Sequence, residues 1–150
     1  MTTLILPRPL LDEMTTHASR LFPEEVCGLV GGREGRAARL YPVENVRHSP
    51  VAFEMEPLQQ IKALLAIEAE GLELLAIYHS HPDGPARPSA TDVANAYYPD
   101  AVQLIISLAD RRQPSLRAFT IIDGAVAEVG WEEDGTTDST DFTDSQEGNL

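Results

Sequence analysis

The sequence predicts one α+β domain of the α/β/α type, in which a mixed β-sheet is flanked by helices. Segments with apolar residues at helical intervals alternate with short apolar runs that are typical of buried strands. Near the C-terminal end, Asp123-Gly124 separates two strand-like segments, which strongly indicates a hairpin. With 150 residues and 43% hydrophobic content, the chain is long enough to bury one core.

Three segments predict helices, namely residues 9–22, 57–70 and 89–98. The first has apolar side chains three and four residues apart and ends before Pro23. The second opens at Pro57, a favoured position for proline, and ends at Gly71. Its large apolar residues lie along one side, and they are Leu58, Ile61, Leu64 and Leu65. The third opens with Ser89 as N-cap and Asp92 at the third helical position.

Six segments predict strands, because each is a short apolar or alternating run bounded by turn residues. They are residues 26–31, 36–43, 74–78, 102–108, 116–122 and 125–129. Residues 44–55 are expected to be irregular. After Trp131 the composition changes to Asp, Glu, Thr, Ser and Gly. We therefore expect a domain of residues 1–131 followed by a disordered acidic tail of residues 132–150.

The formal net charge is −13, with 24 acidic and 11 basic residues. Nucleic-acid binding needs a basic footprint, so no nucleic-acid partner is expected. An acidic surface suits a partner with basic patches, and it suits solubility alone equally well. No apolar stretch is long enough to span a bilayer, and the first residues lack the features of a signal peptide. A cytoplasmic protein without a membrane partner is the expectation.

The segment His79-Ser80-His81-Pro82 directly follows a predicted buried strand. Side chains repeat every second residue on a strand, so His79 and His81 project to the same side. Asp92 comes eleven residues after the second histidine, at the start of a predicted helix. Two imidazoles and one carboxylate make a three-ligand zinc site with one position open for water. The pattern therefore favours one Zn²⁺ per chain and hydrolysis by a metal-activated water.

Each of these residues also has a simpler interpretation. Histidines at a strand end are often exposed surface groups. Ser89 and Asp92 fit the start of a helix, where a hydroxyl and a carboxylate satisfy free N–H groups and no metal is needed. The two interpretations of Asp92 are compatible, because a capping carboxylate just after the histidine loop can face the end of the strand.

A metal hydrolase also needs a general base and a group that stabilises the oxyanion. Glu24 and Glu25 precede a predicted buried strand, and spacing alone neither chooses between them nor excludes a solvated loop pair. Ser89, at the mouth of the histidine loop, has the chemistry to assist the oxyanion. Cys27 is the only cysteine, so no internal disulfide forms. A thiol hydrolase built on Cys27 is a rival hypothesis, although no activating neighbour is evident.

Together these motifs resemble those of the JAMM (MPN+, Mov34/PAD-1 type) zinc metallopeptidases. Residues 79–92 match the signature H-x-H-P-x(6)-S-x(2)-D, and residues 23–31 are similar to the block P-x-E-x-C-G-L-L-x-G. The resemblance extends over about residues 4–129. It implies that His79, His81 and Asp92 are zinc ligands. It also implies that Glu25 is the catalytic base and that the Ser89 hydroxyl binds the oxyanion.

The resemblance further implies a fold similar to that of cytidine deaminases and cleavage after the C-terminal glycine of a ubiquitin-like protein. Asn45, residues 53–57 and residues 97–101 resemble the short prokaryotic branch. Members of that branch act on ubiquitin-like sulfur-carrier proteins, including release of cysteine from a carrier. The expected partner is therefore a ubiquitin-like or sulfur-carrier protein ending in Gly-Gly. The alternative is a catalytically inactive scaffold of the same fold that serves as a protein-interaction module.

Overall fold

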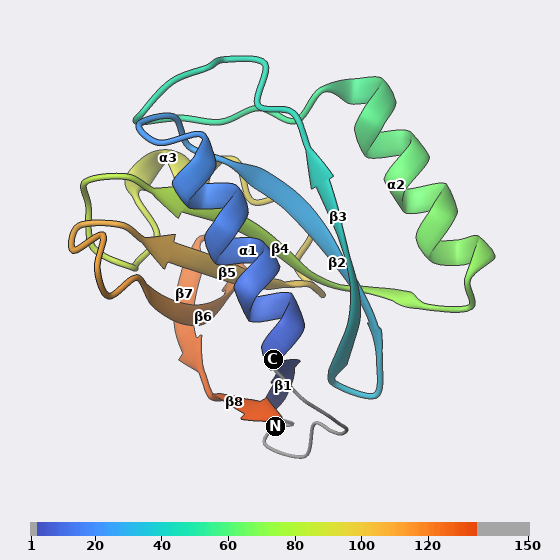
Figure 1. The fold of residues 1–150 in the computed structure, drawn as a ribbon. Coiled ribbons are helices and arrows are strands. Elements are labelled where there is room, and N and C mark those ends of the chain that lie inside the picture. Colours follow the sequence, from blue (N-terminus) through green and yellow to red (C-terminus); the bar gives the residue numbers. More distant parts are fainter. Residues whose placement is uncertain (1–2, 135–150) are drawn as a thin grey trace.

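The computed structural model describes residues 3–134, and these form an eight-stranded mixed sheet with helices on both faces (Figure 1). The strands are β1 Leu4–Pro7, β2 Cys27–Arg33, β3 Arg36–Val43, β4 Glu73–His81, β5 Val102–Ser107, β6 Ser115–Ile122, β7 Ala125–Val129 and β8 Trp131–Asp134. The helices are α1 Arg8–Arg20, α2 Pro57–Ala69 and α3 Ala90–Ala94. The predicted fold class is confirmed, and every predicted helix and strand is present.

The order of the strands across the sheet is β7-β6-β5-β4-β2-β3-β1-β8. β4 pairs in parallel with β5 and antiparallel with β2, so both of its edges are occupied. β1 is parallel to both β3 and β8, and the remaining pairs are antiparallel. Because β4 lies inside the sheet, backbone ladders on both sides fix the direction of every side chain along it.

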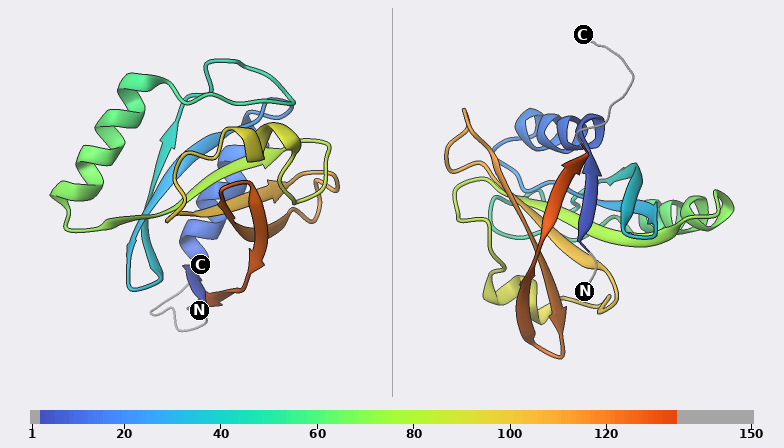
Figure 2. Two further views of the ribbon diagram at one scale, coloured as in Figure 1. Left: turned by 180° about the vertical axis from the view of Figure 1, so that it is seen from behind. Right: turned by 90° about the horizontal axis from the view of Figure 1, so that it is seen from below.

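The helices divide the core into two layers, one on each face of the sheet. In Figure 2, α1 and α3 lie on opposite sides of the sheet. Tyr78 of β4 packs with Met14 of α1 in one core cluster, whereas Ile77 packs with Ile67 of α2 in the other. This alternation along β4 means that the odd-numbered residues after Ile77 face the side of α2 and α3.

A close approach between β2 and β4 fixes the α1 side of the core. Gly28 pairs with Tyr78, and a Cβ atom at Gly28 would lie 2.4 Å from the tyrosine ring. The ring is fully buried, and its hydroxyl forms a 2.8 Å hydrogen bond with Nδ1 of His17 on α1. Burial lowers the pKa of His17, with a smaller contribution from Arg20. Glycine is thus required at this position by the ring that crosses it.

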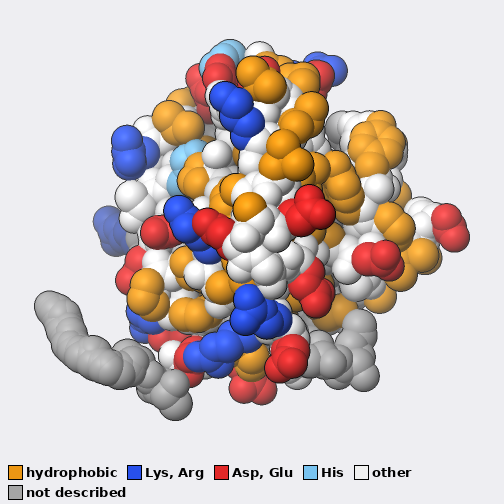
Figure 3. All heavy atoms as spheres, turned by 90° about the vertical axis from the view of Figure 1, so that its right-hand side faces the viewer, with side chains coloured by type: hydrophobic (Ala, Val, Ile, Leu, Met, Phe, Trp, Pro, Cys, Tyr) orange, Lys and Arg blue, Asp and Glu red, His pale blue; other side chains and the backbone are white. Residues whose placement is uncertain are grey.

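Helix α2 turns most of its large apolar residues outward. Ala63 and Ile67 face the sheet, whereas Leu58, Ile61 and Leu65 are 56%, 54% and 59% exposed. Figure 3 shows apolar side chains gathered on the side of the molecule that carries α2. The residues of α2 that are buried in the core cluster on this face are Ala63 and Ile67. Among the described residues, no helix is long and apolar enough to cross a membrane.

Two short strands at one side of the sheet, β1 and the edge strand β8, were not predicted from the sequence. β8 includes residues 132–134, so the prediction that disorder begins at residue 132 is wrong for these three positions. The free edge of β1 offers them a backbone partner, and Arg8 donates to Glu133 at 2.8 Å while Arg36 pairs with Asp134. The rest of the predicted tail, residues 135–150, lies outside the described residues.

Candidate metal centre

Strand β4 places both histidines on the same face of the sheet, as its period predicts. His79 pairs with Cys27 of β2 and Ile105 of β5, and it is 1% exposed. Ser80 points the opposite way, where its hydroxyl accepts a 2.9 Å hydrogen bond from the N–H of Val26. A small polar residue between two histidines in a buried strand needs such a partner, and this bond ties β4 to the segment just before β2.

A capping box at the start of α3 holds the carboxylate. The Ser89 hydroxyl accepts from the N–H of Asp92 at 3.0 Å, and Asp92 Oδ2 accepts from the N–H of Ser89 at 2.9 Å. The helix ends at Ala94 rather than near Tyr98, so its predicted length is wrong. The chain turns there because it must reach β5, and the N–H of Ala101 bonds to the carbonyl of Tyr98.

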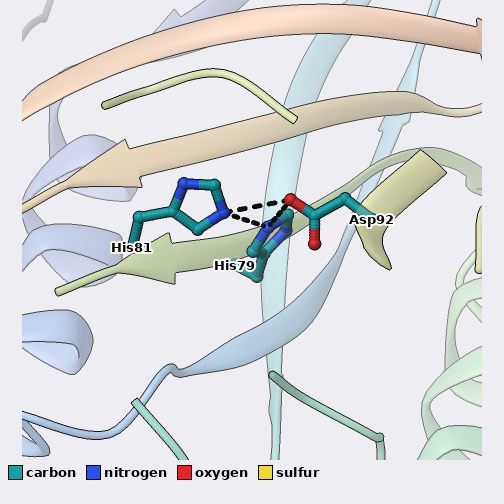
Figure 4. Close-up of side chains that lie close together, drawn as sticks. All are labelled: His79, His81 and Asp92. Carbon is teal, nitrogen blue, oxygen red and sulfur yellow. Dashed lines mark hydrogen bonds and ion pairs between the residues drawn. The ribbon is translucent and has the colours of Figure 1, made fainter. Parts of the chain in front are cut away.

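Three side chains converge on one point between β4 and α3 (Figure 4). Asp92 Oδ2 lies 3.1 Å from Nε2 of His79 and 3.0 Å from Nε2 of His81, and the two nitrogens are 3.1 Å apart. These contacts cannot all be hydrogen bonds, because each imidazole nitrogen directs a single proton or lone pair along its ring plane. Tetrahedral zinc with ligands at about 2.0–2.1 Å would set these atoms about 3.3 Å apart. The triangle therefore fits a metal ion.

Electrostatics favour the ligand forms of His79 and Asp92. Burial lowers the pKa of His79, which keeps its imidazole neutral. Burial acts against ionisation of Asp92, but its contacts with His79 and His81 outweigh burial and hold the pKa of Asp92 well below its usual range. For His81, burial opposes the charged form, but Asp92 and the carbonyl of Pro85 outweigh it and raise the pKa, so a metal ion bound at His81 would displace a proton. A carboxylate and a neutral imidazole are the states in which these residues bind cations.

The two histidines are supported differently. Nδ1 of His81 lies 2.8 Å from the carbonyl oxygen of Pro85, an acceptor that fixes the ring tautomer and leaves Nε2 for the centre. His79 has no hydrogen-bond partner at its buried Nδ1 within the described chain. Its ring instead stacks on Phe53, with centroids 4.6 Å apart and planes at 28°. No periodicity or spacing in the sequence predicts these contacts of Phe53 and Pro85, because one contact is long-range and the other uses a backbone atom.

The structure separates the two candidate bases. Glu25 is 4% exposed, and its Oε1 has no hydrogen-bond partner among the described residues. Burial raises the pKa of Glu25 to about 7; the charge of His81 lowers it and that of Asp92 raises it, so Glu25 lies within electrostatic reach of both. Glu24 instead faces solvent and pairs with His48 at 3.1 Å. A buried carboxylate with a pKa near neutrality is suited to accept and return a proton.

Cys27 lacks the environment of a nucleophile. The thiol is fully buried and donates to the carbonyl of Val43 at 3.4 Å. Burial, with a smaller effect of Glu25, raises the pKa of Cys27 to about 12. A reactive thiol needs a lowered pKa and access to substrate, so these observations count against the thiol hydrolase hypothesis.

A groove leads to the centre along the α2 side. It encloses about 420 Å³ between the loop after β3, the start of α2 and the segment after α3. A smaller hollow of about 30 Å³ continues it to His79 and Asp92. The two share Phe53, Asn95 and Gln103 in their walls. An extended peptide lying in this groove would therefore end next to the three converging side chains.

The fold and the His-x-His plus aspartate centre define a JAB1/MPN-type domain of the JAMM class. The model of the Prok-JAB family, described as prokaryotic homologs of the JAB domain, matches residues 7–122. The chain belongs to this family, as its motifs predicted.

Two relatives of known name are similar over most of the chain. The CysO-cysteine peptidase of Mycobacterium tuberculosis is 38% identical over 127 residues, which cover 83% of this chain and 87% of that protein. The probable TtuB-protein conjugate cleaving protease of Thermus thermophilus is 44% identical over 122 residues, with 81% and 78% covered.

Solved structures agree on the fold. The solution structure of a protein from Desulfitobacterium hafniense superposes with a TM-score of 0.81 at 38% identity, covering 88% of this chain and 93% of that one. A JAB1/MPN domain protein from Archaeoglobus fulgidus gives a TM-score of 0.55 at 19% identity, covering 89% of this chain and 100% of that one, which shows the fold alone.

Proposed function

We propose that this protein is a zinc-dependent peptidase that hydrolyses the bond after the C-terminal glycine of a ubiquitin-like or sulfur-carrier protein. The observation that carries the proposal is the convergence of His79, His81 and Asp92 on one point, with the buried carboxylate of Glu25 within electrostatic reach of His81 and Asp92. Nitrogen and carboxylate donors in this number match a catalytic zinc site, which keeps one position open. A cytoplasmic location and one zinc ion per chain are parts of the same proposal.

The side chains around the centre have different roles in the proposed hydrolysis. Zn²⁺ bound by His79, His81 and Asp92 would polarise the scissile carbonyl and lower the pKa of a water molecule. Glu25 takes a proton from the attacking water and returns it to the leaving nitrogen, a task suited to its raised pKa. The Ser89 hydroxyl donates a hydrogen bond to the developing oxyanion, since the bond that it accepts from the N–H of Asp92 leaves its own O–H available.

The substrate class follows from the groove and the relatives. An extended chain end would lie in the groove, and the hollow that continues it to His79 is narrow. This shape is consistent with a tail that ends in Gly-Gly. The names of the two relatives point to a sulfur carrier and to a protein conjugate as substrates. We infer a carrier of this kind as the partner, attached to cysteine, to a lysine side chain or to a following peptide.

The test is cleavage of candidate carriers by zinc-loaded protein. Carriers extended beyond their terminal Gly-Gly are incubated with the wild type, and mass spectrometry identifies the product ends. We expect a single cut after the last glycine. Glu25→Gln should lose cleavage and retain zinc, because Glu25 is not a ligand, whereas His79→Ala should lose both.

Glu24→Gln is the matched control, since the same chemical change falls on the exposed neighbour. It should cleave at the wild-type rate. Full activity in Glu25→Gln would refute the assignment of the base. A protein that takes up no zinc at any loading and cuts no carrier would instead be the inactive scaffold.

A further inference from the structure

One buried side chain near the centre has no part in the mechanism above. Asn45, in the loop after β3, is 6% exposed and uses its whole hydrogen-bonding capacity. Its Nδ2 donates to the carbonyl of Glu25 at 2.9 Å and to that of Ala52 at 3.1 Å. Its Oδ1 accepts from the N–H groups of Arg47 and Glu54, both at 3.0 Å. Two donors and two acceptors are satisfied at once, which is the full inventory of a primary amide.

The side-chain NH₂ group of Asn45, its donor half, donates to the backbone carbonyl of Glu25, the proposed base. Glu25 lies before the first residue of β2, so the ladders of the sheet do not hold its backbone. The loop supplies both partners instead: Ser49 accepts from the N–H of Glu25 at 2.9 Å, and Asn45 donates to its carbonyl. Since the carboxylate itself has one oxygen without a partner, its position depends on this backbone anchorage.

The side-chain oxygen of Asn45, its acceptor half, accepts from the N–H of Glu54 and so closes the loop that carries Phe53. Glu54, which donates to Asn45, directly follows Phe53, and the ring of Phe53 stacks on His79 at 4.6 Å. An isolated bridge between Asn45 and Met55 closes the same loop. A single side chain thus connects the backbone of the base to the ring that packs on one proposed ligand.

We propose that Asn45 is a positioning residue for hydrolysis. Its donor bonds hold Glu25 at the distance from the centre that proton transfer requires, and its acceptor bonds hold Phe53 against His79. The kinetic part of this inference rests on the proposed function, because it takes Glu25 as the base. The structural part, coupling of the Glu25 backbone to the loop, stands on the hydrogen bonds alone.

Asn45→Asp removes the donor bonds of this side chain and keeps its acceptor bonds. The new carboxylate still accepts from the N–H groups of Arg47 and Glu54, but it has no proton for the carbonyls of Glu25 and Ala52 and repels them. Asn45→Ala removes both halves without adding a charge. Gln113→Glu is the matched control, since it makes the same amide-to-acid change at an exposed turn.

The experiment measures kcat and KM for carrier cleavage, bound zinc, and amide hydrogen exchange of the metal-free protein. Asn45→Asp should lower kcat about tenfold or more, because a displacement of the order of 1 Å is costly for proton transfer. KM and zinc content should stay near the wild-type values. Exchange should accelerate in residues 24–26 and remain slow in residues 53–55. Asn45→Ala should also raise KM and accelerate exchange in both segments.

A double-mutant cycle distinguishes positioning from general stability. If Asn45 acts through Glu25, the double variant Asn45→Asp/Glu25→Gln should have a residual cleavage rate within about twofold of that of Glu25→Gln alone. The proposal is overturned if Asn45→Asp keeps kcat within twofold of the control, or if exchange accelerates equally in α1, which would show global destabilisation. A wild type that cleaves no carrier refutes the proposed function, and the exchange data then still decide the coupling.

Discussion

Replacing Glu25 by glutamine should stabilise the metal-free protein in a way that depends on pH. The pKa of Glu25 is raised by burial from its ordinary value of 4.5 to about 7. The folded state therefore binds a proton more tightly than the unfolded state does, and stability falls as the pH rises through this window. Below pH 4.5 the carboxyl is neutral in both states and costs nothing; above pH 7 the folded protein carries a buried charge.

The size of this effect on the unfolding free energy follows from the difference between the pKa values of Glu25 in the folded and unfolded states. A difference of roughly 2.5 pH units corresponds to about 3 kcal/mol at full ionisation. Glu25→Gln removes this charge but keeps a polar group of the same size, so its packing effect is the same at every pH. Hence the gain in unfolding free energy of the variant over the wild type should be about 3 kcal/mol larger at pH 8 than at pH 4.

Urea denaturation in the presence of a chelator measures this difference, with Glu24→Gln as the control on an exposed neighbour. The control should show a pH-dependent change well below 1 kcal/mol, as expected for an exposed charge. If the change for Glu25→Gln is also below about 1 kcal/mol, the Glu25 carboxylate is solvated or paired in solution, and the structural basis for its role as base fails.

Two other substitutions test the packing and the capping that build the site. Gly28→Ala places a methyl group 2.4 Å from the Tyr78 ring and should cost about 1–3 kcal/mol of unfolding free energy, whereas Gly130→Ala, with no atom within 4 Å, should be nearly neutral. Ser89→Ala loses the cap of α3 and should cost about 1 kcal/mol in urea denaturation, with a fall in kcat at saturating carrier. Zinc should remain bound in Ser89→Ala, because Asp92 keeps its contacts with both histidines; loss of zinc there would refute this division of roles.

The features that the sequence predicted well are those set by local chemistry. The two-residue period of a strand places His79 and His81 on one face, and the capping box places Asp92 at the start of α3. Both are decided within a few residues and do not depend on the rest of the fold. The family and the fold class followed from the same motifs and are confirmed. The roles of the individual residues remain predictions.

The features that sequence reasoning missed depend on contacts between distant segments. Periodicity defined an apolar side of α2, but Ala63 and Ile67 are the residues that the helix buries, and Leu58 and Ile61 face solvent. β8 is short and acidic, and it forms because β1 offers an open edge. Asn45 and Phe53 reach the centre only through the closure of a loop, for which no spacing rule exists.

The burial of Cys27 determines how this protein responds to disulfides and to oxidants. A thiol attacks a disulfide only when the thiol is ionised and accessible to it. The sole thiol of this chain is sealed inside the sheet with a pKa of about 12, and the proposed zinc ligands are nitrogen and oxygen atoms. Cys27 is therefore expected not to exchange with disulfides in solution, and oxidation of sulfur would not release a zinc ion held by these nitrogen and oxygen atoms.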